Sequence, residues 1–80
     1  MVNRDDVIAK INARLRGTIG DAALAAWAFD TFYAIDQGEE EVDADGSDAI
    51  ADALDQLMFA DEKPFALDEA DLRRLIASLE

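Results

Sequence analysis

Apolar residues recur at helical spacing in four separate segments of this chain. In the first segment, one stripe of a helix is formed by Val7, Ile8, Ile11 and Leu15. Each such segment can bury one face against its neighbours, so the pattern predicts an all-α fold with no strand. We expect the helices at about residues 4–16, 20–36, 47–60 and 68–79.

Capping signals indicate where two of these helices begin. An N-cap side chain accepts a hydrogen bond from the first turn, and an acid three residues later can accept one from the N-cap backbone. Asn3 with Asp6, and Asp68 with Asp71, have this spacing. We therefore expect the first helix to follow Asn3 and the fourth helix to follow Asp68.

The second expected helix, residues 20–36, has apolar side chains on more than one side. Its main stripe consists of Leu24, Ala28, Thr31 and Ile35, flanked by Trp27 and Phe32. Phe29 and Tyr33 point more than about 120° away from this stripe. Either neighbouring helices cover this helix on two sides, as is common in a small bundle, or the two rings are partly exposed.

Four helices in 80 residues leave only short connections, so we expect one domain, residues 1–80, folded as a compact four-helix bundle. The segment 37–46 is acidic and contains two glycines. It is the connection that we expect to move most.

Several classes of function require residues that this chain lacks. It has no Cys, which excludes disulfides and thiolate chemistry, and no His, which removes the commonest general base and metal ligand. We therefore expect no enzyme, no cofactor and no metal site. The first residues lack the apolar core of a signal peptide, and no apolar run reaches the roughly 20 residues that span a bilayer. The expected location is cytoplasmic, with no membrane partner.

The charge of the chain is strongly negative and unevenly distributed. Seven basic and nineteen acidic residues give a net charge of −12, and residues 21–62 contain thirteen acids and no base. Such a surface repels nucleic acid and attracts basic proteins. The acids either serve only to solvate a small domain or form a binding surface for a basic protein.

The third expected helix has the most distinctive charged face. Ser47 or Asp45 is its expected N-cap, and its outward face carries Asp48, Asp52, Asp55 and Phe59. Like charges at this spacing repel one another, and a cationic partner would relieve that repulsion. We expect these four residues to bind a basic protein. Glu39, Glu40 and Glu41 would steer the partner, and Tyr33 would be a second anchor.

Two motifs offer alternatives for the same region. The run beginning at Asp43 is similar to an EF-hand calcium loop, but Asp48 stands where the turn glycine belongs and Leu54 where the bidentate Glu belongs. In size, charge and helix count the chain is also similar to acyl carrier proteins, which carry a phosphopantetheine arm on a serine. That resemblance implies modification at Ser47, although Gly46 and Asp48 depart from the family's Asp-Ser-Leu motif.

A third resemblance combines Gly17-Thr18-Ile19, the Trp27-Ala28 pair, the acidic middle and the terminal run Phe65 to Leu72. With these features the chain resembles small acidic helical bacterial proteins, including the colicin and pyocin immunity proteins. The resemblance implies a four-helix antidote that neutralises a basic partner such as a nuclease toxin. The chain lacks the Tyr-Tyr pair of the colicin DNase immunity proteins, so no binding residue is carried over from them.

The oligomeric state stays open at this point. The chain is either a monomer or a homodimer, because exposed Phe29 and Tyr33 could bury each other across a dimer axis.

Overall fold

The computed structural model describes residues 1–62 and 67–80 and confirms the all-α, four-helix fold. Phe65, part of the terminal run of the immunity-type resemblance, lies outside the described residues. The helices are α1 (Arg4–Leu15), α2 (Asp21–Asp36), α3 (Ser47–Leu57) and α4 (Glu69–Leu79). Within the described residues, the only β-type pairing is an isolated bridge between Val2 and Val42.

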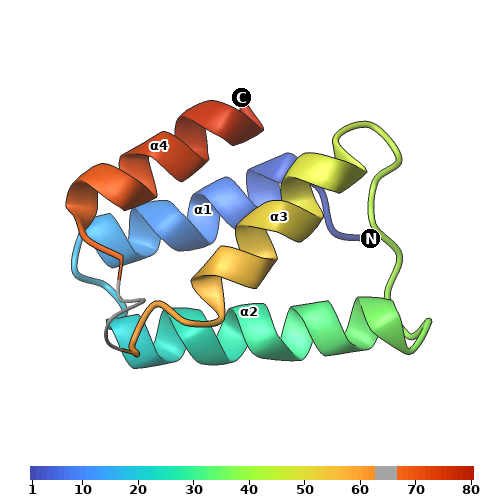
Figure 1. The fold of residues 1–80 in the computed structure, drawn as a ribbon, viewed down its shortest axis with the longest axis horizontal. Coiled ribbons are helices and arrows are strands. Elements are labelled where there is room, and N and C mark those ends of the chain that lie inside the picture. The colour runs from blue at the N-terminus through green and yellow to red at the C-terminus, as the bar shows by residue number, and fades with distance from the viewer. Residues whose placement is uncertain (63–66) are drawn as a thin grey trace.

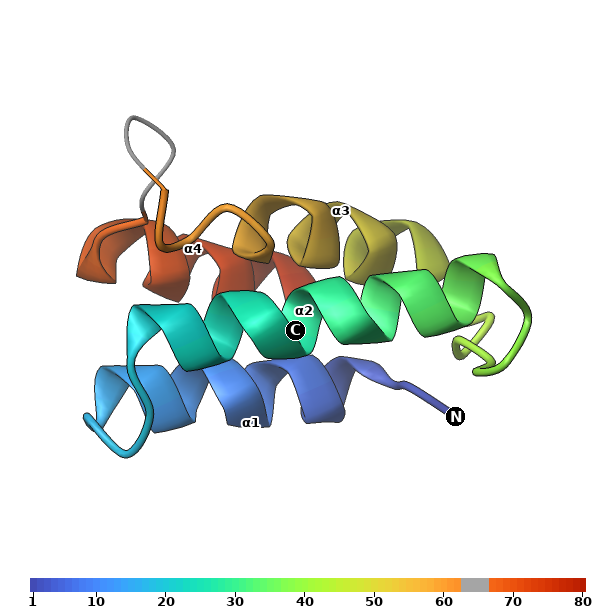
Figure 2. The same ribbon diagram turned by 90° about the horizontal axis from the view of Figure 1, so that it is seen from below.

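The four helices lie at different depths around one core. In Figure 1, α4 and α2 lie at opposite edges of the molecule, with α1 and α3 between them. Figure 2 shows α1 and α3 on opposite sides, with α3 on the side that faces the viewer of Figure 1. Helix α3 packs against α1, α2 and α4, so its inward face is enclosed and only its outward face meets solvent.

The core takes side chains from every helix. The largest fully buried ones are Val7, Ile11, Leu24, Ile50, Leu54, Leu57, Leu72 and Leu79. In α2, Leu24 and Ala28 of the predicted stripe are buried, whereas Ile35 is only partly buried. Because the inward face of α3 is wholly apolar, its carboxylates are confined to the outward face.

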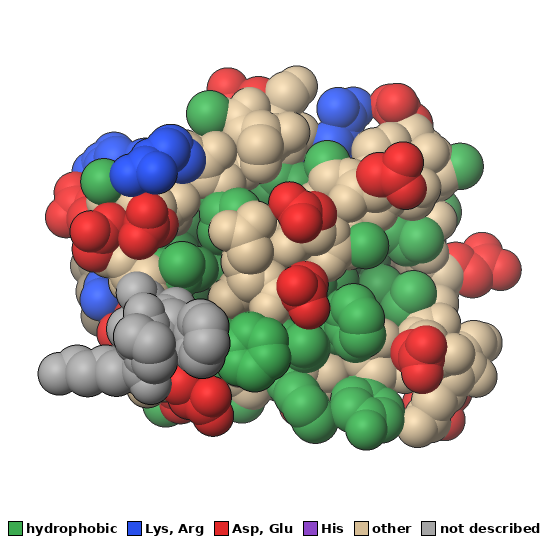
Figure 3. Space-filling model, viewed as in Figure 1, with side chains coloured by type: hydrophobic (Ala, Val, Ile, Leu, Met, Phe, Trp, Pro, Cys, Tyr) green, Lys and Arg blue, Asp and Glu red, His purple; other side chains and the backbone are tan. Residues whose placement is uncertain are grey.

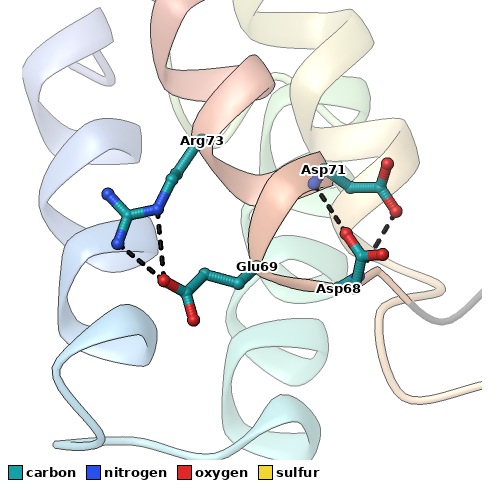
Figure 4. A network of polar contacts seen from close by, with 4 residues as sticks. All are labelled: Asp68, Glu69, Asp71 and Arg73. Carbon is teal, nitrogen blue, oxygen red and sulfur yellow. Dashed lines mark hydrogen bonds and ion pairs between the residues drawn. The ribbon is translucent and has the colours of Figure 1, made fainter.

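Capping at the first and last helices agrees with the sequence. The Asn3 side chain accepts a hydrogen bond from the Asp6 backbone N–H at 2.9 Å. The Asp68 side chain accepts one from the Asp71 backbone N–H at 2.8 Å (Figure 4). Figure 4 also shows Arg73 beside Glu69, an exposed pair one turn apart on α4.

The start of α3 differs from the prediction. The N-cap residue is Gly46, in a left-handed conformation with φ 89°, and no side chain caps the helix. Ser47 is already the first helical residue, and the Asp45 backbone N–H donates to the Asp43 carboxylate instead. A glycine takes this φ without the steric penalty that Ser or Asp would meet, so the tight entry into α3 decides the cap. The helix ends at Leu57 rather than at residue 60.

Replacement of Gly46 by alanine should destabilise the fold. A Cβ at this position would lie 2.9 Å from Cδ of Arg4, and the left-handed φ adds its own strain. A left-handed φ alone costs about 1–2 kcal/mol in the free energy of unfolding, and we expect Gly46→Ala to lose more than this, as measured by urea denaturation. Gly17→Ala is the matched control, because it has a similar φ of 79° with open space around it. Equal losses in the two variants would show that the Arg4 contact contributes nothing.

The 37–46 connection is tied to the start of the chain, which sequence reasoning missed. The Val2 backbone N–H donates to the Glu41 carbonyl at 2.7 Å, and the Asp43 N–H donates to the Val2 carbonyl at 2.8 Å. The Met1 ammonium lies 2.8 Å from the Glu40 carboxylate. The hydrogen bond to Glu40 and the negative charge of Glu40 raise the pKa of the Met1 amino group above its usual value.

Candidate functional site

The three predicted carboxylates of α3 form one exposed row. Asp48, Asp52 and Asp55 are spaced three or four residues apart on the helix, so their side chains are neighbours on its surface. All three are exposed. Figure 3 shows acidic side chains on the solvent-facing side of α3, above a surface of hydrophobic side chains. We call these three residues the acidic row.

No cation neutralises the acidic row within residues 1–62 and 67–80. The arginines in that part of the chain that form ion pairs do so with other acids: Arg4 with Asp45, Arg14 with Asp21, Arg73 with Glu69 and Arg74 with Asp71. Among the described residues, the one hydrogen bond to the row comes from Gln56, whose amide lies 3.2 Å from the Asp52 carboxylate. Because Gln56 is neutral, the row keeps its mutual repulsion.

Arg14 is an example of a base that forms an ion pair with an acid from another segment of the chain. Its guanidinium bridges from the end of α1 to Asp21 at the start of α2. The hydrogen bond from Arg14 to Asp21 and the carboxylate's charge raise the pKa of Arg14 above its usual value. Arg14 thus joins two segments of the chain, and within residues 1–62 and 67–80 the acidic row has no such partner.

Phe59 lies two residues beyond the end of α3 and is 40% exposed. With Asp55, Gln56 and Leu67 it lines an open hollow of about 350 Å³. The structure therefore brings the predicted aromatic next to the last acid of the row. An apolar ring beside a carboxylate is a suitable anchor for a side chain with an apolar stem and a cationic head.

The predicted steering acids are brought together only in part. Glu39 and Glu41 are exposed, but Glu40 is partly buried and holds the Met1 ammonium. Glu40 is therefore engaged in an ion pair within the chain, whereas Glu39 and Glu41 are the more exposed of the three acids. The backbone N–H groups of Glu39 and Glu40 both donate to the Ala34 carbonyl, so the acids begin directly after α2.

Tyr33 and Phe29 form an exposed pair on α2. Each is 49% exposed, and their ring centroids lie 4.9 Å apart at an interplanar angle of 40°. Of the two alternatives for this side of α2, the structure therefore shows the second, in which the two rings are partly exposed. The neighbours fail to cover it because α1 and α3 pack on the inward side, where Leu24 and Ala28 are buried.

An apolar groove between α2 and α3 was not expected from the sequence. Its volume is about 220 Å³. We call it the α2/α3 groove, and it is lined by Phe32, Ile35, Asp36, Val42, Ala51 and Leu54. The sequence feature that could have indicated this groove is Ala51, because its small side chain leaves space on α3 opposite the larger Phe32 and Ile35. Only the packing of two helices and the connection between them places these residues together.

Larger and chemically different features lie elsewhere. An open hollow of about 510 Å³ lies between α1 and α2, where the Lys10 ammonium is 5.9 Å from the centre of the Trp27 ring.

Ser47, the predicted attachment point in the carrier-like alternative, is partly buried in the first turn of α3. Among the residues described, no polar or charged side chain is buried, and no group of three or more carboxylates is arranged to hold a metal ion.

These features define a small all-α, four-helix domain with an acidic and partly aromatic surface over α2 and α3. Comparison with models of known protein families, with curated proteins and with solved structures found no match to this chain. None of the helices in the described part of the chain is both long and apolar enough to cross a membrane.

Proposed function

We propose that this protein is a non-enzymatic binding module that captures a basic protein partner. The observation that carries the proposal is the acidic row, three exposed carboxylates on one helix face with no Lys or Arg paired to them in the described residues. Such a row costs the free protein stability through repulsion, and a cationic surface would remove that cost on binding.

Capture would proceed in two stages. The negative field of the acidic row, together with Glu39 and Glu41, steers a basic surface towards α3 and accelerates encounter. Phe59 and Tyr33 then provide apolar contact that slows dissociation, because exposed aromatic rings that become desolvated dominate many interfaces. The partner is blocked by steric and electrostatic contact, with no bond made or broken.

The kind of partner follows from the immunity-type resemblance, which is part of this proposal. A basic nuclease toxin has the positive surface that this acidic face would cover. A protein that binds such a surface would exclude the toxin's own anionic substrate, since both compete for the same cations. The protein would then act as an antidote to that toxin.

The test is a pull-down from the source organism's lysate at low salt, followed by a high-salt wash and mass spectrometry. We expect one basic protein to be retained at stoichiometric amount after the high-salt wash. The variant Asp48→Asn, Asp52→Asn, Asp55→Asn should retain much less of it. Diffuse binding of many basic proteins, or equal retention by the variant, would show that the acids serve only to solvate the domain.

The matched control neutralises three exposed acids away from α3: Asp5→Asn, Asp30→Asn and Glu80→Gln. Asp5 and Glu80 lie where the beginning of α1 meets the end of α4, and Asp30 borders the hollow between α1 and α2. Both triple variants change the net charge equally, so a difference between them reports the position of the charge. We expect the control variant to retain nearly as much partner as the wild type.

The variant Phe59→Ala should mainly accelerate dissociation of the captured protein. We expect the dissociation rate to rise roughly tenfold or more, because a desolvated aromatic anchor typically contributes at least 1.4 kcal/mol. The association rate should change little, since no charge is altered. Surface plasmon resonance measures both rates. A slower association with unchanged dissociation would mean that Phe59 is not an anchor.

A further inference from the structure

The α2/α3 groove lies beside the acidic row. On α3, Ala51 is three residues after Asp48 and four before Asp55, so both carboxylates are surface neighbours of the groove wall. Asp36 adds a carboxylate from the α2 side. In Figure 3, the hydrophobic surface over α2 continues to the edge of α3, where the acidic side chains begin. The groove is therefore an apolar strip with carboxylates on both sides.

The size of the groove limits what fits in it. Sites for drug-sized molecules enclose roughly 300–1,000 Å³, and this groove holds about 220 Å³. It suits one or two apolar side chains that belong to a larger partner. Its floor includes Leu54, which is fully buried, and its walls include Phe32 and Ile35, which are partly buried, so a side chain seated there would lose most of its contact with water.

We propose that the α2/α3 groove receives the apolar face of a basic amphipathic helix presented by the partner. This inference rests on the proposed function and specifies the structure that the captured surface must have. One or two Leu- or Ile-sized side chains would occupy the groove. Lys or Arg residues three or four positions away on the same helix would reach the acidic row and Asp36.

A helix fits the groove better than an extended segment because of its backbone. The surface of the groove is almost wholly apolar, so an extended chain lying in it would leave its N–H and C=O groups without hydrogen-bond partners. A helix satisfies these groups internally.

Charge selects a basic helix over a second copy of this chain. A second copy docked on the same face would bring its own acidic row against this one, and each copy has a net charge of −12. Like charges placed opposite one another cost several kcal/mol across an interface. A basic helix turns the same carboxylates into favourable contacts.

The experiment uses two synthetic helical peptides of about 18 residues, or five turns. Both carry Lys on one face, and the opposite face carries Leu in one peptide and Ala in the other. We expect the wild-type protein to bind the Leu peptide at least about tenfold more tightly than the Ala peptide, as measured by fluorescence anisotropy. In NMR spectra, the methyl signals of Val42, Ala51 and Leu54 should shift with the Leu peptide only.

The variant Ala51→Phe fills the groove from an exposed position on α3. We expect it to reduce binding of the Leu peptide to the level of the Ala peptide and to leave the Ala peptide unchanged. Ala77→Phe, at an exposed position on α4, is the matched control and should retain the preference for Leu. Equal binding of both peptides by the wild type, or an Ala51→Phe variant that keeps the preference, would overturn the inference.

The two proposals fail in distinguishable ways. Salt-sensitive binding of the Ala peptide that is lost in the Asp48, Asp52 and Asp55 triple variant supports the proposed function, even where the groove plays no part. Absence of binding by either peptide contradicts both proposals. Self-association of the wild type that Ala51→Phe abolishes, measured by sedimentation, would assign the groove to a second copy of the chain and overturn the inference.

Discussion

Replacing Leu24 by alanine is expected to lower the free energy of unfolding by roughly 2–5 kcal/mol. Leu24 is fully buried in α2, the helix that packs against both α1 and α3. The change removes apolar contact and leaves a cavity that the neighbouring helices α1 and α3 cannot close without shifting. A chain of 80 residues at about 0.05–0.15 kcal/mol per residue is stable by only about 4–12 kcal/mol, so the loss is a large share of the total.

Urea denaturation followed by circular dichroism measures this loss. Leu15→Ala is the control, because Leu15 is only partly buried at the end of α1 and should lose clearly less. A loss below about 1 kcal/mol for Leu24→Ala would mean that α2 is not at the centre of the core. Neither residue belongs to the acidic row or the α2/α3 groove, so the test is independent of function.

Neutralising the acidic row is expected to slow association with the partner roughly tenfold or more at low salt. Steered association reaches about 10⁸–10⁹ M⁻¹s⁻¹, whereas neutral surfaces associate at about 10⁵–10⁶ M⁻¹s⁻¹. The variant Asp48→Asn, Asp52→Asn, Asp55→Asn removes the charges nearest to the proposed contact and keeps the shape of the side chains. The difference from the wild type should shrink as salt rises, because the Debye length falls to about 8 Å at 0.15 M.

Stopped-flow measurements over a range of salt concentrations test this expectation with the captured protein. The same variant should unfold at slightly higher urea, since each repulsive pair one turn apart costs about 0.2–0.5 kcal/mol. Salt-independent association of the wild type, or association of the variant as fast as that of the wild type, would contradict electrostatic capture by this face. The opposite signs of the two effects, slower binding with higher stability, separate a functional charge from one that maintains the fold.

Local features of the fold could be predicted because their causes lie within one turn of chain. Asn3 and Asp68 cap their helices through acids three residues away, and both caps occur as expected. The start of α3 was predicted wrongly because the chain enters this helix at Gly46 with a left-handed φ, which places Ser47 inside the helix; Arg4, a residue 42 positions earlier, lies against this turn. No sequence pattern within a few residues of Gly46 predicts that contact.

The features of the candidate site also differ in whether the sequence alone could predict them. Helical spacing was sufficient to place the acidic row on the outward face of α3, and the row is exposed. Helical spacing predicted only the side of α2 on which Phe29 and Tyr33 lie. Whether a neighbouring helix covers the two rings depends on where α1 and α3 pack. The engagement of Glu40 by the Met1 ammonium joins residues 39 positions apart and could not be read from either segment alone.

The sequence by itself determined four amphipathic helices, two of their caps, and the concentration of negative charge between residues 21 and 62. These follow from periodicity, side-chain bonds to nearby backbone and composition, which act over a few residues. The tertiary structure alone decided the α2/α3 groove, the exposure of the Phe29–Tyr33 pair and the anchoring of the 37–46 connection by Val2. Each of these depends on how separate segments meet, and close packing of their side chains fixes that arrangement.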